Sequence, residues 1–276
     1  MTTWLITGCS TGLGRHLAQA VLARGWNAIV TARDPAGIQD IVKPYPNSSI
    51  ALRLDVTDRE QVAAVVRQAE ARFGALDVLV NNAGYGYRAA VEEAGETDVE
   101  ELFATNVFGP VSLIKAVLPG MRKRRHGAIV NVSSIAARRT APGSGYYSAT
   151  KCALEGLSDG LRKEVGPLGI KVIVVEPGAF MTDFSGRSLT QSHTVIPDYA
   201  ETAGRRRKEN DKTDGQQPGD PARGADVIVK AVEAPHPPFR LLLGSDAVAV
   251  VTAELDAQRA EVETWKAISV TTDFPS

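Results

Sequence analysis

The stretch that decides the fold reads Trp4-Leu5-Ile6-Thr7-Gly8-Cys9-Ser10-Thr11-Gly12-Leu13-Gly14. Its apolar start predicts a short buried strand, and apolar residues at helical spacing after Gly14 predict a helix that stops at Gly25. A strand, a glycine turn and a helix bring unpaired backbone N–H groups and the positive end of a helix dipole to one point. We therefore expect this turn to hold a diphosphate, although its Gly-x-x-x-Gly-x-Gly spacing differs from the usual G-x-G-x-x-G fingerprint.

The rest of the sequence repeats this alternation of strand and helix, which implies an α/β fold. We expect a single-domain, doubly wound parallel sheet of Rossmann-like type with helices on both faces. Further strands are predicted at Trp26–Ala32, Ser49–Asp55, Leu76–Val80, Ala128–Val132, Lys171–Val175 and Phe239–Leu243. Helices are predicted from Asp58, over Val99–Met121, from Tyr147 through Val165 to Gly169, over Pro221–Ala234 and over Asp246–Ile268.

One domain is expected over residues 1–276, with two special segments inside it. Residues 179–220 are rich in Ser, Thr, Gly, Pro and charge, and loops of this length are usually functional or disordered. We interpret them as a substrate-binding loop or lid. Residues 238–276 are expected to add a C-terminal strand and helix.

Composition excludes several classes of partner. The formal net charge is −1, which argues against a nucleic-acid partner or an anionic membrane surface. Cys9 and Cys152 are too few for a disulfide framework or a cysteine zinc site, and no metal site is expected. The amino terminus has no basic leader, and no run reaches the roughly 18 apolar residues of a membrane span. A cytoplasmic location is the expectation.

Tyr147 and Lys151 are a candidate acid–base pair. They lie four residues apart, so on a helix they share one face. A free tyrosine titrates at about pH 10. A nearby ammonium favours the phenolate, which would lower the tyrosine pKa. Tyr146 is a poor substitute, because it points about 100° away around the helix.

The end of the second strand discriminates between nicotinamide cofactors. An arginine there accommodates a 2′-phosphate, whereas a carboxylate binds the free 2′-hydroxyl. Arg33 therefore predicts NADP(H) rather than NAD(H). Asp34 would be the carboxylate that binds the ribose if the strand ends one or two residues later.

These features together resemble the classical short-chain dehydrogenase/reductase family from about Thr2 to Thr182. The thirteen-residue gap before Tyr147 selects Ser134 rather than Ser133, which the strand pleat would turn to the other face. The matching pieces are Thr7-Gly8-x-x-x-Gly12-Leu13-Gly14, Asp55-Val56, Asn81-Asn82-Ala83-Gly84, Asn106, Ser134, Tyr147-x-x-x-Lys151 and Pro177-Gly178-x-x-x-Thr182.

The resemblance implies a role for each matching residue. Tyr147 would exchange a proton with the substrate oxygen, Lys151 would hold the nicotinamide ribose and lower the tyrosine pKa, and Ser134 would bind the carbonyl oxygen. Asn106 would support a water relay behind Lys151, and Thr182 would anchor the nicotinamide amide. Cofactor contacts are also implied for Gly8, Ser10, Gly12, Leu13, Gly14, Arg33, Asp55, Val56, Asn82, Ala83, Gly84, Tyr147, Lys151, Pro177 and Gly178.

The implied reaction is hydride transfer between NADP(H) and a largely apolar ketone, aldehyde or secondary alcohol. Arg138 and Arg139 depart from an apolar pocket, and either solvent exposure or recognition of an acidic substituent would explain them. Besides Ser134, the expected substrate-pocket residues are Tyr85, Tyr87, Ile135, Ala136, Phe180, Phe184 and His193.

Two other functions are alternatives to this one. The first is an NADP-sensing interaction protein without turnover, which the intact Asn, Ser, Tyr and Lys set disfavours. The second is a serine hydrolase, but no G-x-S-x-G elbow exists. Relatives of this family pair through long helices, so a homodimer or homotetramer is expected.

Overall fold

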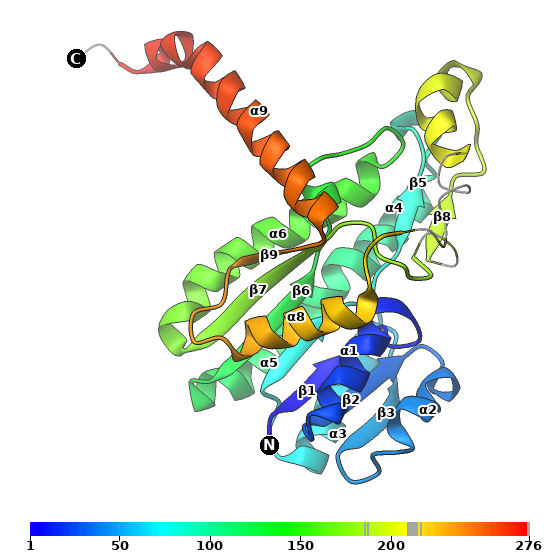
Figure 1. The fold of residues 1–276 in the computed structure, drawn as a ribbon, viewed down its shortest axis with the longest axis vertical. Coiled ribbons are helices and arrows are strands. Elements are labelled where there is room, and N and C mark those ends of the chain that lie inside the picture. Colours follow the sequence, from blue (N-terminus) through cyan, green and yellow to red (C-terminus); the bar gives the residue numbers. More distant parts are fainter. Residues whose placement is uncertain (185, 187, 209–214, 216, 275–276) are drawn as a thin grey trace.

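The computed structural model describes residues 1–184, 186, 188–208, 215 and 217–274. Among these residues, seven parallel strands form one sheet in the order β3-β2-β1-β4-β6-β7-β9 (Figure 1). The predicted parallel sheet is therefore confirmed. Its strands are β1 (Thr3–Ile6), β2 (Asn27–Ala32), β3 (Ser49–Arg53), β4 (Val78–Asn81), β6 (Gly127–Val132), β7 (Ile170–Pro177) and β9 (Arg240–Leu243).

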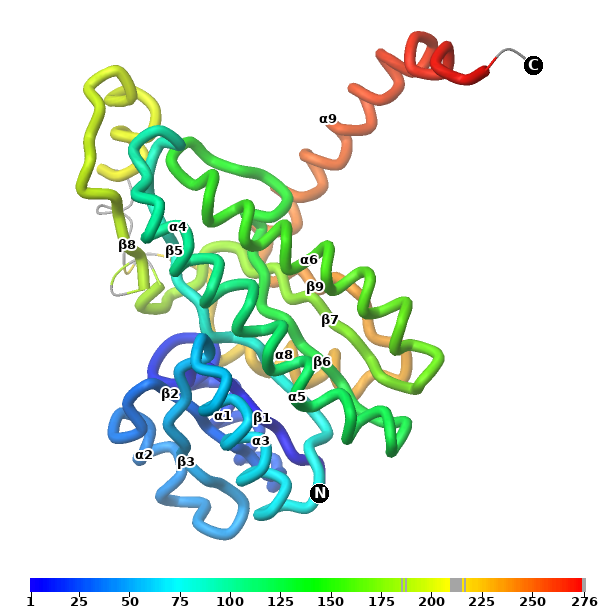
Figure 2. Tube along the Cα trace, turned by 180° about the vertical axis from the view of Figure 1, so that it is seen from behind, coloured from blue at the N-terminus to red at the C-terminus, as the bar shows by residue number. Residues whose placement is uncertain are grey.

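Helices cover both faces of the sheet, as Figures 1 and 2 show from opposite sides. One face carries α1 (Gly12–Ala23), α2 (Gln39–Val42) and α8 (Pro221–Glu233). The other carries α3 (Arg59–Phe73), α5 (Gly109–Arg124) and α6 (Gly145–Val165).

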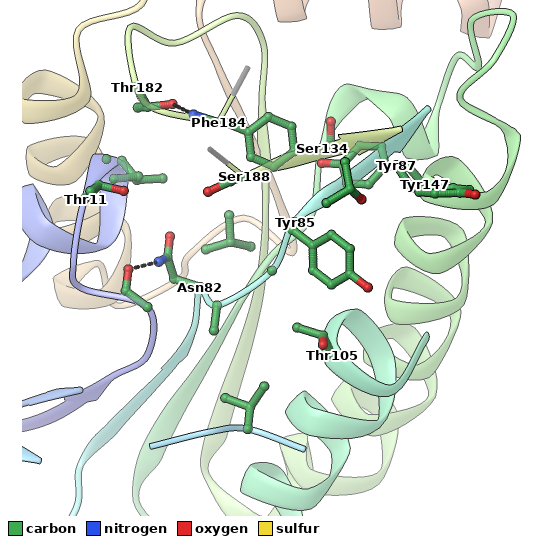
Figure 3. A pocket seen from close by; sticks show the side chains of 18 of the residues that line it. Thr11, Asn82, Tyr85, Tyr87, Thr105, Ser134, Tyr147, Thr182, Phe184 and Ser188 are labelled. Atoms are coloured by element: carbon green, nitrogen blue, oxygen red, sulfur yellow. Dashed lines mark hydrogen bonds between the residues drawn. The ribbon is translucent and has the colours of Figure 1, made fainter. Parts of the chain in front are cut away.

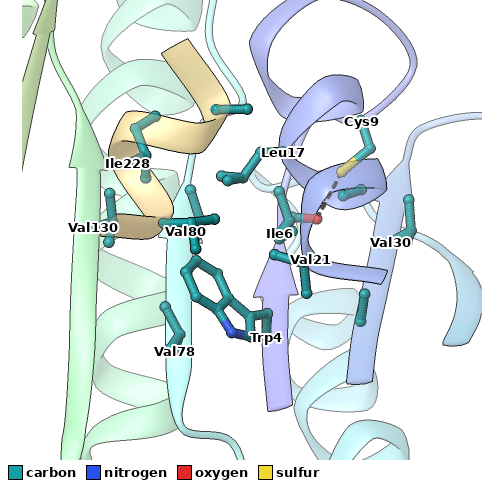
Figure 4. Packing of buried hydrophobic residues seen from close by; sticks show 14 of the residues in the cluster. Trp4, Ile6, Cys9, Leu17, Val21, Val30, Val78, Val80, Val130 and Ile228 are labelled. Carbon is teal, nitrogen blue, oxygen red and sulfur yellow. Dashed lines mark hydrogen bonds between the residues drawn. The ribbon is translucent and has the colours of Figure 1, made fainter. Parts of the chain in front are cut away.

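The strands alternate their side chains between two apolar cores, as the pleat requires. Trp4 and Ile6 of β1 pack with Leu17 and Ile228 from the helices of one face (Figure 4). Leu5, between them in sequence, belongs to the core on the other face. Burial on both faces explains why the strands appear in the sequence as continuous apolar runs.

The strand order places a crevice at one edge of the sheet. β1 pairs with β2 on one side and with β4 on the other. Strands β2 and β3 are therefore added toward one edge of the sheet, and the later strands toward the other. Ligands of open α/β sheets bind at such a switch point, beyond the carboxyl ends of the strands. The glycine turn follows β1 at this point.

The helix predicted over Val99–Met121 is longer and is interrupted. It comprises α4 (Glu96–Phe103), a π-helical segment η3 (Ala104–Phe108) and α5. The stretch Glu96–Arg124 is long and apolar enough to cross a membrane by length and composition alone. Its residues Leu113 and Val117 nevertheless lie in the core against the sheet, which is how a core helix meets the same criterion.

The segment predicted as a lid contains regular structure that the sequence did not predict. β8 (Leu189–Gln191) pairs in parallel with β5 (Gly86–Arg88), and short helical turns follow at Pro197–Tyr199 and Ala200–Gly204. Residues 185, 187, 209–214 and 216 of this segment lie outside the described residues. The backbone N–H of Ile196 donates to Oε1 of buried Glu93 over 2.9 Å, which holds the segment against the loop before α4.

The expected C-terminal strand and helix are β9 and α9 (Ser245–Ser269). α9 packs against the body only through its first two turns, where Ala247 and Val251 are buried. Beyond them it extends away from the body (Figure 1).

Candidate active site

A cavity of about 860 Å³ lies beyond the carboxyl ends of β1, β4, β6 and β7 (Figure 3). It therefore occupies the expected crevice. Gly14 and Asn106 are not part of its lining, whereas most of the other predicted catalytic, cofactor and substrate residues are. These are Gly8, Ser10, Gly12, Leu13, Arg33, Asp55, Val56, Asn82, Ala83, Gly84, Tyr85, Ser134, Tyr147, Lys151, Pro177, Gly178, Phe180, Thr182 and Phe184.

The glycine turn has the shape of a cradle for an anion. Gly8 and Gly12 have φ angles of 70° and 58°, which favour glycine. A Cβ on Gly8 would lie 2.8 Å from the Cα of Ala83, and one on Gly14 only 2.3 Å from Nδ2 of Asn82. α1 begins at Gly12, so its first-turn N–H groups, which have no intrahelical partner, stand at the turn. The turn therefore fits the diphosphate expected from the sequence.

Asn82 and Thr7 fasten this turn to the end of β4. Nδ2 of Asn82 donates to the carbonyls of Thr7 and Gly8 over 2.9 and 3.0 Å. Oγ1 of Thr7 accepts from the backbone N–H groups of Asn82 and Ala83. Asn82 therefore shapes the cradle as well as lining the cavity.

Arg33 and Asp34 have different surroundings at the end of the cavity that is expected to hold the adenosine. Arg33 is exposed, follows β2 directly and lines the cavity. The carboxylate of Asp34 instead accepts the N–H of Ala36 over 2.9 Å and caps the short helix at Pro35–Ile38. Asp55 holds Thr57 in the next turn in the same way, over 2.7 Å to its hydroxyl. This geometry favours Arg33 over Asp34 as the residue that contacts the adenosine ribose.

Tyr147, Ser134 and Lys151 converge on one wall of the cavity. Tyr147 and Lys151 are both buried on the inward face of α6, and Nζ of Lys151 lies 5.7 Å from the centre of the tyrosine ring. Lys151 donates to the carbonyl of Val132 over 2.9 Å. The Ser134 hydroxyl lies near the Tyr147 phenol and favours its ionised form, whereas Ser133 turns away and donates to Glu155 over 2.8 Å. The choice of Ser134 over Ser133 therefore agrees with the geometry.

Burial dominates the acid–base properties of this pair. It raises the pKa of Tyr147 to about 12, against the opposing effects of the Ser134 hydrogen bond and the Arg88 charge. It lowers the pKa of Lys151 to about 8, against the opposing charge of Glu155. The sequence predicts a tyrosine pKa lowered by Lys151; in this structure desolvation of the phenolate raises it instead, and the opposing effects come from Ser134 and Arg88. Near neutral pH the pair is a neutral phenol beside an ammonium, which is the protonation state of a proton donor.

Comparison with known proteins identifies the family of this chain. Residues 2–192 match the family described as short chain dehydrogenase. This chain belongs to the short-chain dehydrogenase/reductase (SDR) family. It is therefore an oxidoreductase of the NAD(P)-dependent class.

Four proteins illustrate how similar this SDR is to known ones. Oxidoreductase BOA17 of Botryotinia fuckeliana is 38% identical over 268 residues, 97% of each chain. The 3-ketodihydrosphingosine reductase of Bacteroides thetaiotaomicron is 40% identical over 243 residues, 87% of each chain. A solved short-chain dehydrogenase from Streptomyces avermitilis is 45% identical with a TM-score of 0.92, covering 99% of this chain and 100% of its own. ElxO, solved with NADP bound, is 28% identical with a TM-score of 0.74, covering 90% of this chain and 99% of its own.

Several residues expected on the substrate side line the cavity of this SDR. The ring of Phe184 lies 5.6 Å from that of Tyr147, centre to centre, and Tyr85, Tyr87 and His193 also line the cavity. Phe180 is shared with the core, where it packs beside helix α8. Ile135 and Ala136 were expected here and lie outside the cavity lining formed by the described residues.

The structure places the residues of two other predictions, Arg138 with Arg139 and Thr182. Arg138 forms an ion pair with buried Glu176 over 3.3 Å, and Arg139 is exposed; neither lines the cavity. Recognition of an acidic substituent by this pair is therefore not supported. Thr182 faces the glycine turn, where a Cβ on Gly12 would lie 3.2 Å away, and its contact with the nicotinamide amide stays a prediction.

Asn106 connects three parts of the SDR site from within the π-helical segment. Its Nδ2 donates to the carbonyl of Tyr85 over 2.9 Å and to Oγ1 of Thr150 over 3.2 Å. Its Oδ1 accepts from the N–H of Tyr85 over 3.1 Å. Because an inserted π turn reorients side chains, Asn106 reaches both α6 and the loop after β4. The water relay proposed for it stays a prediction.

Sequence reasoning missed two residues beside the site. Arg88 on β5 is partly buried, and its charge favours the ionised form of Tyr147. Asp246 accepts the N–H of Ala179 over 2.7 Å and so holds the turn at Pro177 and Gly178. Neither residue belongs to a spaced motif, so only the tertiary structure brings them to the site.

Proposed function

We propose that this SDR transfers a hydride between NADP(H) and a largely apolar ketone, aldehyde or secondary alcohol. The bound dinucleotide supplies or accepts the hydride. Tyr147 gives the substrate oxygen its proton during reduction and takes it back during oxidation. Ser134 and Lys151 assist through hydrogen bonding and charge.

The observation that carries the proposal is the placing of the Ser134 and Tyr147 hydroxyl groups beside Lys151 on one wall of the cavity. Two hydroxyl groups on one wall give a carbonyl oxygen two donors at the point where negative charge develops. A neutral phenol is the acid that reduction needs, and the nearby Lys151 ammonium favours the phenolate left behind. A pure sensing protein has no use for this arrangement.

Aromatic side chains support an apolar substrate. Phe184, Tyr85 and Tyr87 line the cavity beside the hydroxyl pair. The 40% identical relative is named as a reductase of a keto compound, 3-ketodihydrosphingosine. A ketone with an apolar portion is therefore the first substrate class to test.

Arg33 supports NADP(H) as the cofactor, together with the NADP bound in the ElxO structure. Arg33→Asp is expected to lower the preference for NADPH over NADH by about 100-fold, because it removes charge-assisted hydrogen bonds worth about 1.5–3 kcal/mol and adds repulsion. Dissociation constants from cofactor fluorescence measure this ratio. Arg53→Asp is the matched control, because Arg53 is an exposed arginine at the end of neighbouring β3 and lies outside the cavity lining. An unchanged ratio of NADPH to NADH affinity in Arg33→Asp would mean that another residue recognises the 2′-phosphate.

The proposed function is tested directly by titrating the purified protein with NADPH and then adding apolar ketones and aldehydes. NADPH binding followed by carbonyl-dependent loss of cofactor fluorescence is the expected result. Binding without turnover on any carbonyl would favour the sensing alternative. Cytoplasmic location and association into a homodimer or homotetramer stay predictions from the sequence.

A further inference from the structure

Two buried glutamates and two partly exposed arginines form a network of charges directly behind the catalytic wall. Glu155 of α6 and Glu176 of β7 are both almost fully buried. Nε of Arg240 lies 3.1 Å from Oε2 of Glu155 and 3.4 Å from Oε1 of Glu176. Nε of Arg138 lies 3.3 Å from Oε2 of Glu176. Two acids and two bases balance one another, which is the condition under which such charges tolerate burial.

Glu155 connects this network to the residues of the site. It lies one helical turn after Lys151, so both side chains share the inward face of α6. Lys151 holds the carbonyl of Val132, and Glu155 holds the hydroxyl of the next residue, Ser133, over 2.8 Å. The backbone N–H of Ser133 is fixed in turn by the carbonyl of Val175 over 2.7 Å. Ser134, which lines the cavity with Tyr147, follows directly on this anchored backbone.

Charge provides a second link between Glu155 and the site. Burial favours the neutral form of Lys151, and the carboxylate of Glu155 opposes this. Glu155 faces Lys151 and Cys152 on its own helix, Ser133 just after β6, Glu176 on β7 and Arg240 on β9. Arg240 is partly exposed and offsets the charge of Glu155.

We propose that Glu155 is a positioning residue of this SDR: it aligns the backbone that carries Ser134 and places a negative charge one helical turn from Lys151. Glu155 acts through Ser133 and Lys151 and needs no contact with substrate. The inference rests on the proposed function, because it gives Lys151 and Ser134 the roles described there.

The test compares Glu155→Gln, Glu155→Asp and the control Glu164→Gln, an exposed glutamate on the same helix. Glutamine keeps an acceptor for Ser133 and loses the charge. It is expected to move the alkaline limb of the kcat–pH profile down by about one pH unit from about 8. Turnover then falls about five-fold near pH 8 and changes little near pH 6. Glu155→Asp retains the charge and should keep the alkaline limb within about 0.3 pH units, whatever its kcat.

A second measurement needs no turnover and so separates this inference from the proposed function. The Cε resonance of Lys151, assigned by its absence in Lys151→Met, is titrated by NMR in the wild type and in Glu155→Gln. A downward shift of the Lys151 midpoint supports the inference even if no carbonyl substrate is found. An unchanged midpoint, or a loss of turnover that is uniform across pH, would reduce Glu155 to a packing role and overturn the proposal.

Discussion

Replacing Tyr147 with phenylalanine is expected to lower kcat for ketone reduction by about 10³-fold, because general acid catalysis typically contributes about 10² to 10⁴ in rate. Phenylalanine keeps the ring that lies tilted against Phe184, 5.6 Å between ring centres, and keeps the packing of α6. It removes the hydroxyl that would protonate the substrate oxygen. NADPH affinity should therefore stay within about two-fold of the wild type, since only a transition-state interaction is lost. Steady-state kinetics and cofactor fluorescence measure the two quantities.

Tyr146→Phe is the matched control for this prediction. Tyr146 is the preceding residue on the same helix, and its hydroxyl donates to the carbonyl of Val91 over 3.2 Å. Removing that hydroxyl should leave kcat within about two-fold, because an exposed hydrogen bond is worth only about 1 kcal/mol of stability. If Tyr147→Phe kept more than about a tenth of the wild-type rate, the proton would come from another group. The assignment of Tyr147 as the catalytic acid would then be wrong.

The central sheet could be predicted because its strands are buried on both faces. Each appears as a continuous apolar run that ends at a turn residue, and helical spacing follows each run. Strands β5 and β8 could not be predicted, because each has only three residues and Gly86 pairs with Leu189 far along the chain. Periodicity also cannot detect the π turn around Asn106, because a single inserted residue leaves the apolar spacing on both sides unchanged.

The site could be predicted as far as its residues belong to spaced motifs. The strand pleat was enough to choose Ser134, and helical spacing was enough to pair Tyr147 with Lys151. Glu155 carried the same signal, since it lies four residues beyond Lys151, but its burial and its contact with Ser133 exist only in the tertiary structure. The tyrosine pKa illustrates the same limit. The nearby Lys151 was visible in the sequence, whereas the burial that raises the tyrosine pKa and the Arg88 charge that opposes it were not.

Adding one methyl group at Gly14 is expected to weaken NADPH binding by more than about 100-fold and to lower the free energy of unfolding by about 1–3 kcal/mol, the usual cost of overpacking. The new Cβ would lie 2.3 Å from Nδ2 of Asn82 and 2.6 Å from the carbonyl oxygen of Gly8. Asn82 cannot retreat without losing its hydrogen bonds to Thr7 and Gly8, which hold the turn in shape. Gly14→Ala therefore disturbs the cradle even though Gly14 does not line the cavity. Cofactor fluorescence and chemical denaturation measure the two effects.

Gly156→Ala separates this steric effect from the ordinary consequence of placing alanine in a helix. Gly156 lies within α6, and a Cβ there would meet nothing within 4 Å. Because alanine is the better helix former, this variant should be more stable by up to about 1 kcal/mol and should bind NADPH as tightly as the wild type. The two substitutions are chemically identical, so a difference between them reports the space around each glycine. If Gly14→Ala bound NADPH as tightly as Gly156→Ala, the turn after β1 would not be the diphosphate cradle, and the cofactor would lie elsewhere in the cavity.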